Sequence, residues 1–165
     1  MQSGKLKVIF ISVALLLVGA CTSNESKVGG MLGLNTNLKL EFKVADNINP
    51  DEKRTPSPVY LRFYELKSDK QFNKTDFLEL YERDTESLGD DLVSKQELKR
   101  IAPGEAREEK FVLDKETRYV ALFAEFFQYK DAKYKVVFPV TSSNIFDDRV
   151  LIEISGNTLS LVSKK

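Results

Sequence analysis

Apolar and polar residues alternate through much of this chain, a pattern typical of β-strands with one buried face and one wet face. In residues 37–44 every second residue is apolar and each residue between is polar. Residues 59–66 and 117–128 are apolar on both faces, which predicts strands covered on both sides, and Glu125 within the second run needs solvent or a partner. Further strands are expected at residues 92–101, 107–113, 134–140, 149–155 and 158–162, the last two joined by the hairpin signal Gly156-Asn157.

One segment departs from the two-residue period. In residues 73–87 apolar residues recur with helical spacing from Phe77 onward, with Asn73 or Thr75 as the expected N-cap and Leu88-Gly89 as the expected end. About eight short strands and one helical segment predict a mainly β protein. We therefore expect a two-sheet β-sandwich with a helical insertion between strands 2 and 3.

The first 20 residues contain the parts of a secretory signal. Lys5 and Lys7 precede an uncharged, largely apolar run at residues 8–18. That run is too short to cross a bilayer, because a spanning helix needs about 20 residues. The segment Leu17-Val18-Gly19-Ala20-Cys21 resembles a bacterial lipobox. We therefore predict a lipoprotein signal peptide at residues 1–20 and a diacylglycerol group on the Cys21 thiol.

A lipidated Cys21 would be the first residue of the mature protein. Residues 21–36 are then a lipidated N-terminus and flexible tether, and residues 37–165 form the sandwich domain. Thr22, in place of an aspartate, fits the known sorting pattern for the outer membrane of Gram-negative bacteria. We therefore predict a lipid-anchored protein at the outer membrane, facing the periplasm. Two other interpretations of Cys21 stay open, a buried structural thiol and a disulfide between chains.

The residue types that are missing exclude several classes of chemistry. The chain has 165 residues, no histidine and one cysteine. The usual zinc ligand sets and the Ser-His-Asp and Cys-His arrangements are therefore excluded. We expect no enzyme, no metal and no cofactor apart from acyl chains on Cys21. From Cys21 onward 23 basic and 25 acidic residues leave a net charge of −2, which gives no reason to expect nucleic acid.

Residues 46–58, between the first two strands, are the main candidate for a binding site. Thirteen residues with three prolines and five charges far exceed the two to five residues of a typical hairpin connection. Long loops on a rigid scaffold commonly bind partners. The alternative is a solvated connector whose prolines only prevent sheet extension.

Other candidate sites are weaker. Asp90-Asp91 and Asp147-Asp148 could act as catalytic carboxylate pairs, although adjacent carboxylates in turns are far more often solvated surface. The aromatic stripe of Phe123, Phe126 and Phe127 could line a pocket for a small molecule, but core packing is the simpler explanation.

An ordered set of short motifs resembles the TssJ (SciN-like) family, the outer-membrane lipoproteins of bacterial type VI secretion systems. The set comprises Pro56-Ser57-Pro58-Val59, Arg62-Phe63-Tyr64-Glu65-Leu66, Phe72, Asp76-Phe77, Leu80-Tyr81, Leu88-Gly89, Asp91-Leu92, Thr117-Arg118-Tyr119 and the hairpin at Gly156-Asn157. The resemblance runs from the lipobox to the last strand. It implies a transthyretin-like β-sandwich and binding to the periplasmic C-terminal region of the inner-membrane protein TssM.

In this family the loop between strands one and two is associated with the TssM contact. The resemblance carries that role to Asn49, Pro50, Asp51, Glu52, Lys53, Arg54, Thr55 and Pro56, and we include Asn47 in the expected partner-binding loop. Relatives often have a glycine and a basic residue before Pro-Ser-Pro, where this chain has Arg54-Thr55. No nucleic acid and no small-molecule substrate are expected. Two alternative functions remain: another envelope-assembly lipoprotein of the pilotin type, and a carrier of a small apolar ligand.

Overall fold

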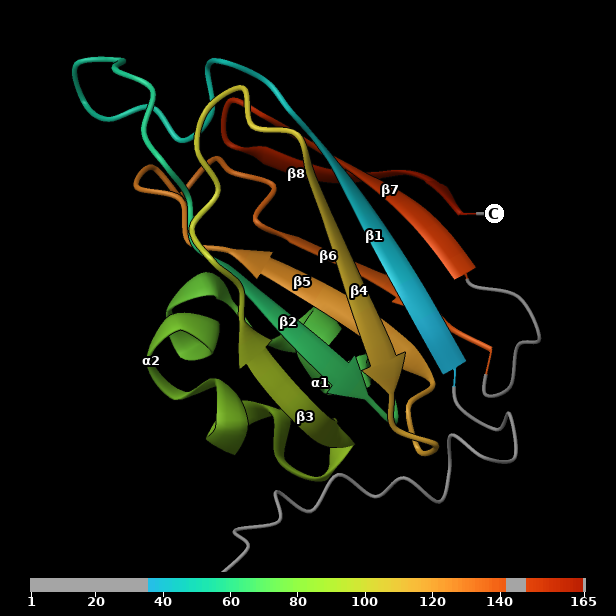
Figure 1. Cartoon of the computed structure of the whole chain (residues 1–165). Coiled ribbons are helices and arrows are strands. Elements are labelled where there is room, and N and C mark those ends of the chain that lie inside the picture. Colours follow the sequence, from blue (N-terminus) through green and yellow to red (C-terminus); the bar gives the residue numbers. More distant parts are fainter. Residues whose placement is uncertain (1–35, 142–147, 165) are drawn as a thin grey trace, which may run out of the picture.

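The computed structural model describes residues 36–141 and 148–164, and within them the chain forms two packed four-stranded sheets (Figure 1). The first sheet has the order β4-β1-β7-β8 and comprises β1 (Thr36–Val44), β4 (Arg107–Leu113), β7 (Asp148–Ser155) and β8 (Thr158–Lys164). The second has the order β3-β2-β5-β6 and comprises β2 (Leu61–Leu66), β3 (Leu92–Glu97), β5 (Tyr119–Ala124) and β6 (Lys135–Pro139). The predicted sandwich of eight strands is confirmed.

The main core lies between the two sheets. Alternate residues of β1 and β7 point into it, and each of them is at most 3% exposed: Leu38, Leu40, Phe42, Val150, Ile152 and Ile154. The rings of Phe63 on β2 and Phe111 on β4 stack with their centroids 4.0 Å apart, joining the sheets near the open β3 and β4 edges. β1 and β7 are the two central strands of the first sheet, and they pair in parallel.

Two helices between β2 and β3 cover the outer face of the second sheet (Figure 1). They are α1 (Lys70–Lys74) and α2 (Phe77–Leu88), followed by the short 3₁₀ segment η2 (Gly89–Asp91). Their apolar residues pack on the outward residues of β2 and β5 in a second cluster that includes Tyr64, Phe72, Phe77, Leu80 and Phe123. This cluster explains why β2 and β5 are apolar on both faces, as the sequence predicted.

The predicted N-caps of the helix are wrong. α2 is capped by Asp76, whose carboxylate accepts the Glu79 backbone N–H at 2.9 Å while the Glu79 side chain accepts the Asp76 N–H. This reciprocal capping box outcompetes Thr75, which instead ends α1 with its hydroxyl on the Gln71 carbonyl. Asn73 lies inside α1. The predicted end at Leu88-Gly89 is confirmed.

Arg62 of β2 fastens α2 to the sheet. Its Nε donates to the Glu125 carboxylate at 2.7 Å and its Nη1 donates to the Asp84 carboxylate at 3.1 Å. Nη1 also donates to the Leu80 and Tyr81 carbonyls, which the non-helical backbone at Arg83 leaves available. Glu125 thus has the partner that its position in an apolar strand required.

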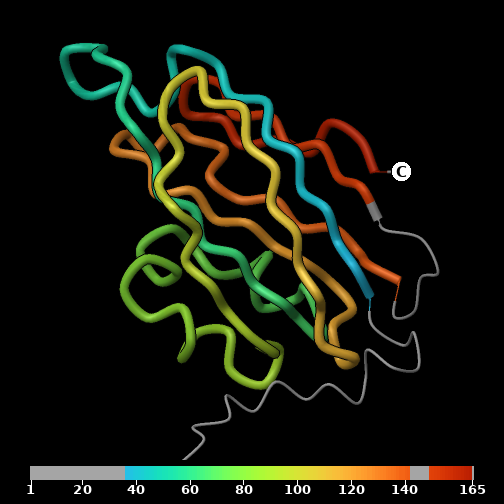
Figure 2. The backbone as a smooth tube through the Cα atoms, viewed as in Figure 1, coloured from blue at the N-terminus to red at the C-terminus, as the bar shows by residue number. Residues whose placement is uncertain are grey.

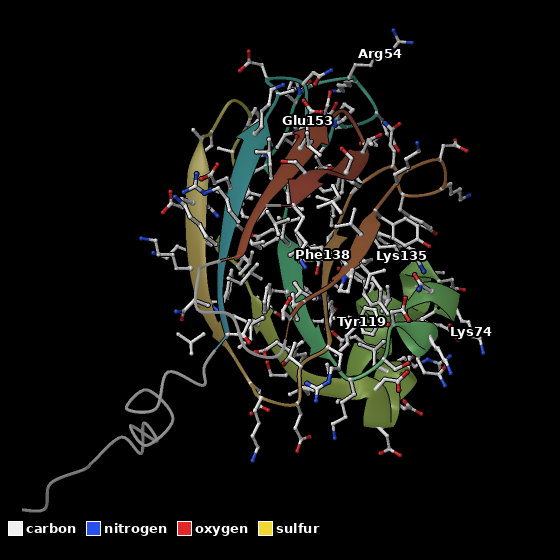
Figure 3. The ribbon with its side chains drawn as sticks, turned by 90° about the vertical axis from the view of Figure 1, so that its right-hand side faces the viewer. Arg54, Lys74, Tyr119, Lys135, Phe138 and Glu153 are labelled. Carbon is white, nitrogen blue, oxygen red and sulfur yellow. The ribbon has the colours of Figure 1, made fainter. Side chains whose placement is uncertain are left out.

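Lys135 of β6 holds the other helix. Its ammonium donates to the carbonyls of Phe72, Asn73 and Thr75 at 2.7–3.0 Å, the acceptors left free at the end of α1. Figure 3 shows Lys135 beside the helical layer. Burial lowers the pKa of Lys135. Both helices are therefore fixed to the sheet by cations that donate to backbone carbonyls, at the C-terminal end of α1 and within α2.

Several strand ends differ from their predicted positions. β5 ends at Ala124 rather than at residue 128, and β3 ends at Glu97, beyond which Ile101 makes only an isolated bridge to Val59. β6 is an edge strand with Pro139 as its last residue, and Gly156-Asn157 forms the predicted two-residue turn.

Within residues 36–141 and 148–164 no helix is long and apolar enough to cross a membrane.

Candidate functional site

The β1–β2 loop, residues 45–60, extends from one end of the sandwich (Figure 2). The described chain starts at the opposite end of β1. A nine-residue strand rises about 3.3 Å per residue, so Thr36 and Val44 lie about 26 Å apart. The loop therefore faces away from the end at which the chain enters the domain. Cys21 and the rest of the predicted lipobox and tether lie outside the described residues.

The base of the loop is built into the protein. Ile48 is fully buried in the main core, and Asn49 is 1% exposed. The Asn49 N–H donates to the Gly156 carbonyl at 2.9 Å, and its Nδ2 donates to the Pro58 carbonyl at 2.9 Å. Its Oδ1 accepts the Phe127 N–H at 2.8 Å. Asn49 thus closes the β1–β2 loop through its bond to Pro58. It also ties the loop to the β7–β8 turn at Gly156 and to the β5–β6 loop at Phe127.

Asn47 adds a second contact with the β7–β8 turn. Its Oδ1 accepts the Gly156 N–H at 3.2 Å, while its side chain is exposed. The β1–β2 loop and the β7–β8 turn are consequently held together through both the N–H and the carbonyl of Gly156.

Asp51 organises the outer part of the loop. Its carboxylate accepts the N–H groups of Lys53 and Thr55, both at 2.8 Å. Its backbone closes a turn with Arg54 and Thr55 through bonds of 2.9 and 3.0 Å. Arg54 has φ of 65°, in the left-handed region that favours glycine. The bonds from Lys53 and Thr55 to the Asp51 carboxylate hold the turn in which Arg54 has this backbone conformation.

The loop tip, residues 52–56, is exposed to solvent (Figure 3, where Arg54 marks it). The side chains of Glu52, Lys53 and Arg54 have no hydrogen bond or ion pair to any other described residue. Pro50 is half-buried and Pro56 is exposed. The two non-glycine residues with positive φ in the described chain, Asn49 and Arg54, both lie in this loop. A base anchored by Asn49 thus presents a charged tip whose side chains are free to bind another molecule.

Nine residues of this site were predicted from the sequence, and the structure divides eight of them into two groups, with Pro50 half-buried between the groups. Asn47, Asn49 and Asp51 form and anchor the loop, whereas residues 52–56 are presented to solvent. Ile48 was not singled out as an anchor, although an apolar residue in an otherwise polar loop was a usable signal. The β5–β6 loop was also missed as a neighbour: Gln128 Nε2 donates to the Asp51 carbonyl at 2.8 Å.

The other candidate sites have simpler roles. Phe123 and Phe126 are at most 2% exposed, and Phe123 packs on Phe77 of α2 with ring centroids 5.1 Å apart. They belong to the cores on opposite faces of the sheet, so neither ring is open to a ligand, while Phe127, the third residue of the predicted stripe, is exposed. Asp91 accepts the Gln71 N–H at 3.3 Å and Asp90 is exposed, while Asp147 lies outside the described residues. Within the described chain no group of three or more acidic side chains could hold a metal.

A model of the family described as "Type VI secretion lipoprotein, VasD, EvfM, TssJ" matches residues 36–157, which is most of the chain. The chain belongs to the TssJ family of type VI secretion lipoproteins. The matched segment contains β1 to β7, the helices and the β1–β2 loop, and it ends just before β8. A comparison with curated proteins found no match.

Solved structures of TssJ proteins and related chains have the same fold. The T6SS lipoprotein TssJ1 from Pseudomonas aeruginosa is 28% identical, with a TM-score of 0.71 over 78% of this chain and 95% of that chain. A chain in the structure of the T6SS protein TssM C-terminal domain from EAEC is 26% identical, with a TM-score of 0.66 over 77% and 98%. Serratia marcescens Lip, described as a membrane bound component of the Type VI Secretion System, is 19% identical, with a TM-score of 0.67 over 79% and 99%, and supports the fold alone.

Proposed function

We propose that this protein is an outer-membrane lipoprotein that binds the periplasmic C-terminal region of TssM through the tip of its β1–β2 loop. The observation that carries the proposal is the loop itself. Its tip displays unpaired charges of both signs on a base that Ile48 and Asn49 fix to the core. A preorganised loop loses little conformational entropy on binding, so its contacts are retained as affinity.

The positions of the loop and the chain start support a coupling role. β1 separates Thr36 from the loop by about 26 Å. Cys21 precedes Thr36 by 15 residues, so acyl chains on Cys21 would hold the opposite end of the domain at the membrane. Each buried methylene contributes about 0.8 kcal/mol, and more than one chain makes the attachment stable. The loop would then face the periplasm, where the C-terminal region of TssM lies.

Membership of the TssJ family supports the choice of partner. A chain with this fold occurs in the structure of the TssM C-terminal domain from EAEC. Membrane attachment confines the lipoprotein near its partner, which raises the effective concentration of the loop, so a modest loop affinity suffices. The proposed function is mechanical. The protein would link the outer membrane to the inner-membrane protein TssM through one protein–protein contact, and this link requires no chemical reaction.

A binding titration tests the loop assignment. The mature acylated protein in detergent is titrated with the periplasmic C-terminal domain of TssM, and a second titration uses a variant whose residues 52–56 are replaced by Gly and Ser at equal length. Ile48, Asn49 and Asp51 are kept, so the base of the loop is retained. We expect binding to fall at least tenfold.

The matched control changes charges at the other end of the sandwich. Lys115→Ser with Glu116→Ser alters the exposed turn between β4 and β5 and should leave binding unchanged. Equal affinity of the loop-tip variant and the wild type, with both folded, would refute the loop as the binding site.

A further inference from the structure

The β5–β6 loop, residues 125–134, exposes an aromatic ring next to the β1–β2 loop. Phe127 is 64% exposed, whereas the preceding Phe126 is 2% exposed and packs in the main core. Of the other large exposed apolar residues in the described chain, Tyr81, Val112, Leu161 and Val162 lie on α2, β4 and β8, whereas Leu78 of α2 borders this loop at Tyr129 and Lys130. Tyr60, 52% exposed, lies at the same end of the molecule as Phe127, since its carbonyl accepts the Glu125 N–H at 3.0 Å.

The backbone that carries Phe127 is fixed from both sides. The Phe127 N–H donates to Asn49 Oδ1 at 2.8 Å, and the neighbouring Gln128 donates to the Asp51 carbonyl at 2.8 Å. On the other side Tyr129 stacks on Phe77 of α2, with ring centroids 4.2 Å apart. The exposed ring is therefore held in a defined place and is not on a freely moving turn.

The two loops form one continuous surface. Asn49 and Asp51, the residues that shape the β1–β2 loop, are the acceptors for the two donors that fix the β5–β6 loop. Side by side they present an apolar ring and a rim of charges of both signs, Glu52, Lys53 and Arg54 from one loop and Lys130 and Asp131 from the other. A central aromatic residue with a charged rim is the usual anatomy of a protein–protein interface.

We propose that Phe127 is an apolar anchor of the same partner interface, and that the periplasmic domain bound by the β1–β2 loop also receives the Phe127 ring in an apolar pocket. The inference rests on the proposed function, because it concerns the same partner. It adds a second contact segment that the loop assignment does not contain. Aromatic anchors in such positions commonly account for most of the affinity of an interface.

Three substitutions test the proposal in the mature acylated protein, with the periplasmic domain of TssM as the probe. Phe127→Ala should weaken binding at least tenfold. Phe127→Leu keeps apolar bulk at this position and should retain most of the wild-type affinity. Neither should change the midpoint of urea unfolding by much, because the ring is mostly exposed. Val112→Ala is the matched control: Val112 is also 64% exposed but pairs with Asn37, near the start of β1, and its substitution should leave binding unchanged.

The outcomes separate this proposal from the proposed function. Undiminished binding of Phe127→Ala, together with lost binding of the variant at residues 52–56, would overturn the anchor and leave the loop assignment standing. A wild-type protein that does not bind the domain would overturn both. A concentration-dependent dimer that Phe127→Ala abolishes, with binding to the domain unchanged, would assign the ring to self-association and would also overturn the anchor.

Discussion

Asn49 Oδ1 accepts the Phe127 N–H at 2.8 Å, across 78 positions in the chain, while Nδ2 of the same side chain donates to the Pro58 carbonyl. One buried amide therefore closes the base of the β1–β2 loop and fixes the β5–β6 loop beside it. Its backbone φ of 45° suits asparagine, which adopts the left-handed conformation more readily than most residues. The shape of the proposed binding surface depends on this residue.

Two substitutions of Asn49 should separate the contribution of its side-chain hydrogen bonds from that of its backbone conformation. Asn49→Gly tolerates the positive φ but removes both side-chain hydrogen bonds, so we expect the free energy of unfolding to fall by about 1–3 kcal/mol. Asn49→Ala also strains the backbone and should cost about 1 kcal/mol more. Urea unfolding followed by circular dichroism measures both. An alanine variant as stable as the wild type would show that the buried amide contributes little.

Loss of Asp84 should loosen the helical layer. Its side chain is 5% exposed and holds Arg62, Lys95 and the Tyr64 hydroxyl. Asp84→Ala leaves the half-buried Arg62 without one carboxylate, and breaking a buried pair in this way costs about 3–5 kcal/mol.

The control for Asp84 removes an exposed ion pair. Glu116→Ala breaks the pair with Lys67, and because both side chains are at least half exposed, the free energy of unfolding should change far less than in Asp84→Ala. Equal losses in the two variants, measured by urea unfolding, would contradict the role assigned to Arg62 and Asp84.

Titration of Asp84 should also make the free energy of unfolding depend on pH in the acidic range. Burial raises the pKa of Asp84, but the hydrogen bonds from Lys95, Tyr64 and Arg62 outweigh it and lower the pKa to about 2, from an ordinary value of 3.8. The unfolded state therefore binds more protons than the folded state between these values, and folding weakens as the pH falls through them. About 2 kcal/mol present above pH 4 should be lost by pH 2.

The comparison for this pH dependence is Asp84→Asn, which cannot titrate at this position. The difference in free energy of unfolding between the wild type and Asp84→Asn should be constant above pH 5 and should shrink as the pH falls from 4 to 2. Chemical unfolding at a series of pH values measures the difference. Parallel curves for the two proteins would show that Asp84 has the same pKa in the folded and unfolded states.

The lipid anchor gives a prediction that concerns Cys21 alone. Without the thiol no diacylglycerol can be attached, so Cys21→Ser should accumulate as an uncleaved precursor outside the outer-membrane fraction. Membrane fractionation and the mass of the purified protein test this. Normal fractionation of the serine variant at the mature mass would exclude the lipobox.

The sandwich could be predicted because its patterns are local. The two-residue alternation of β1 requires one buried face, and the two-sided apolar pattern of β2 and β5 requires a cover on both faces. The order of the strands could not be predicted in this way. The parallel pairing of β1 with β7 joins residues more than 100 positions apart, and neither strand carries a signal of its neighbour.

The position of the candidate site in the chain could be predicted, but the roles of its individual residues could not. Length, prolines and charge distinguished the β1–β2 loop, and all nine named residues lie in or beside it. The division into anchors and tip could not be predicted, because it depends on contacts from distant segments. Asn49 is an anchor only because Phe127 and Gly156 lie next to it in space. The helix cap was missed because Asp76 competes with Thr75 for the same role, and only Asp76 has a glutamate three residues later.

Recruitment of TssM to lipid vesicles tests the central claim most directly, since the claim is that one protein couples the outer membrane to TssM. Vesicles carrying the acylated wild-type protein are sedimented with the soluble periplasmic C-terminal domain of TssM. The account predicts that the domain sediments with these vesicles. It should stay in solution with vesicles carrying the variant at residues 52–56, and with vesicles incubated with Cys21→Ser protein. Equal sedimentation of the domain with wild-type and loop-tip variant vesicles, at equal protein loading, would contradict the account.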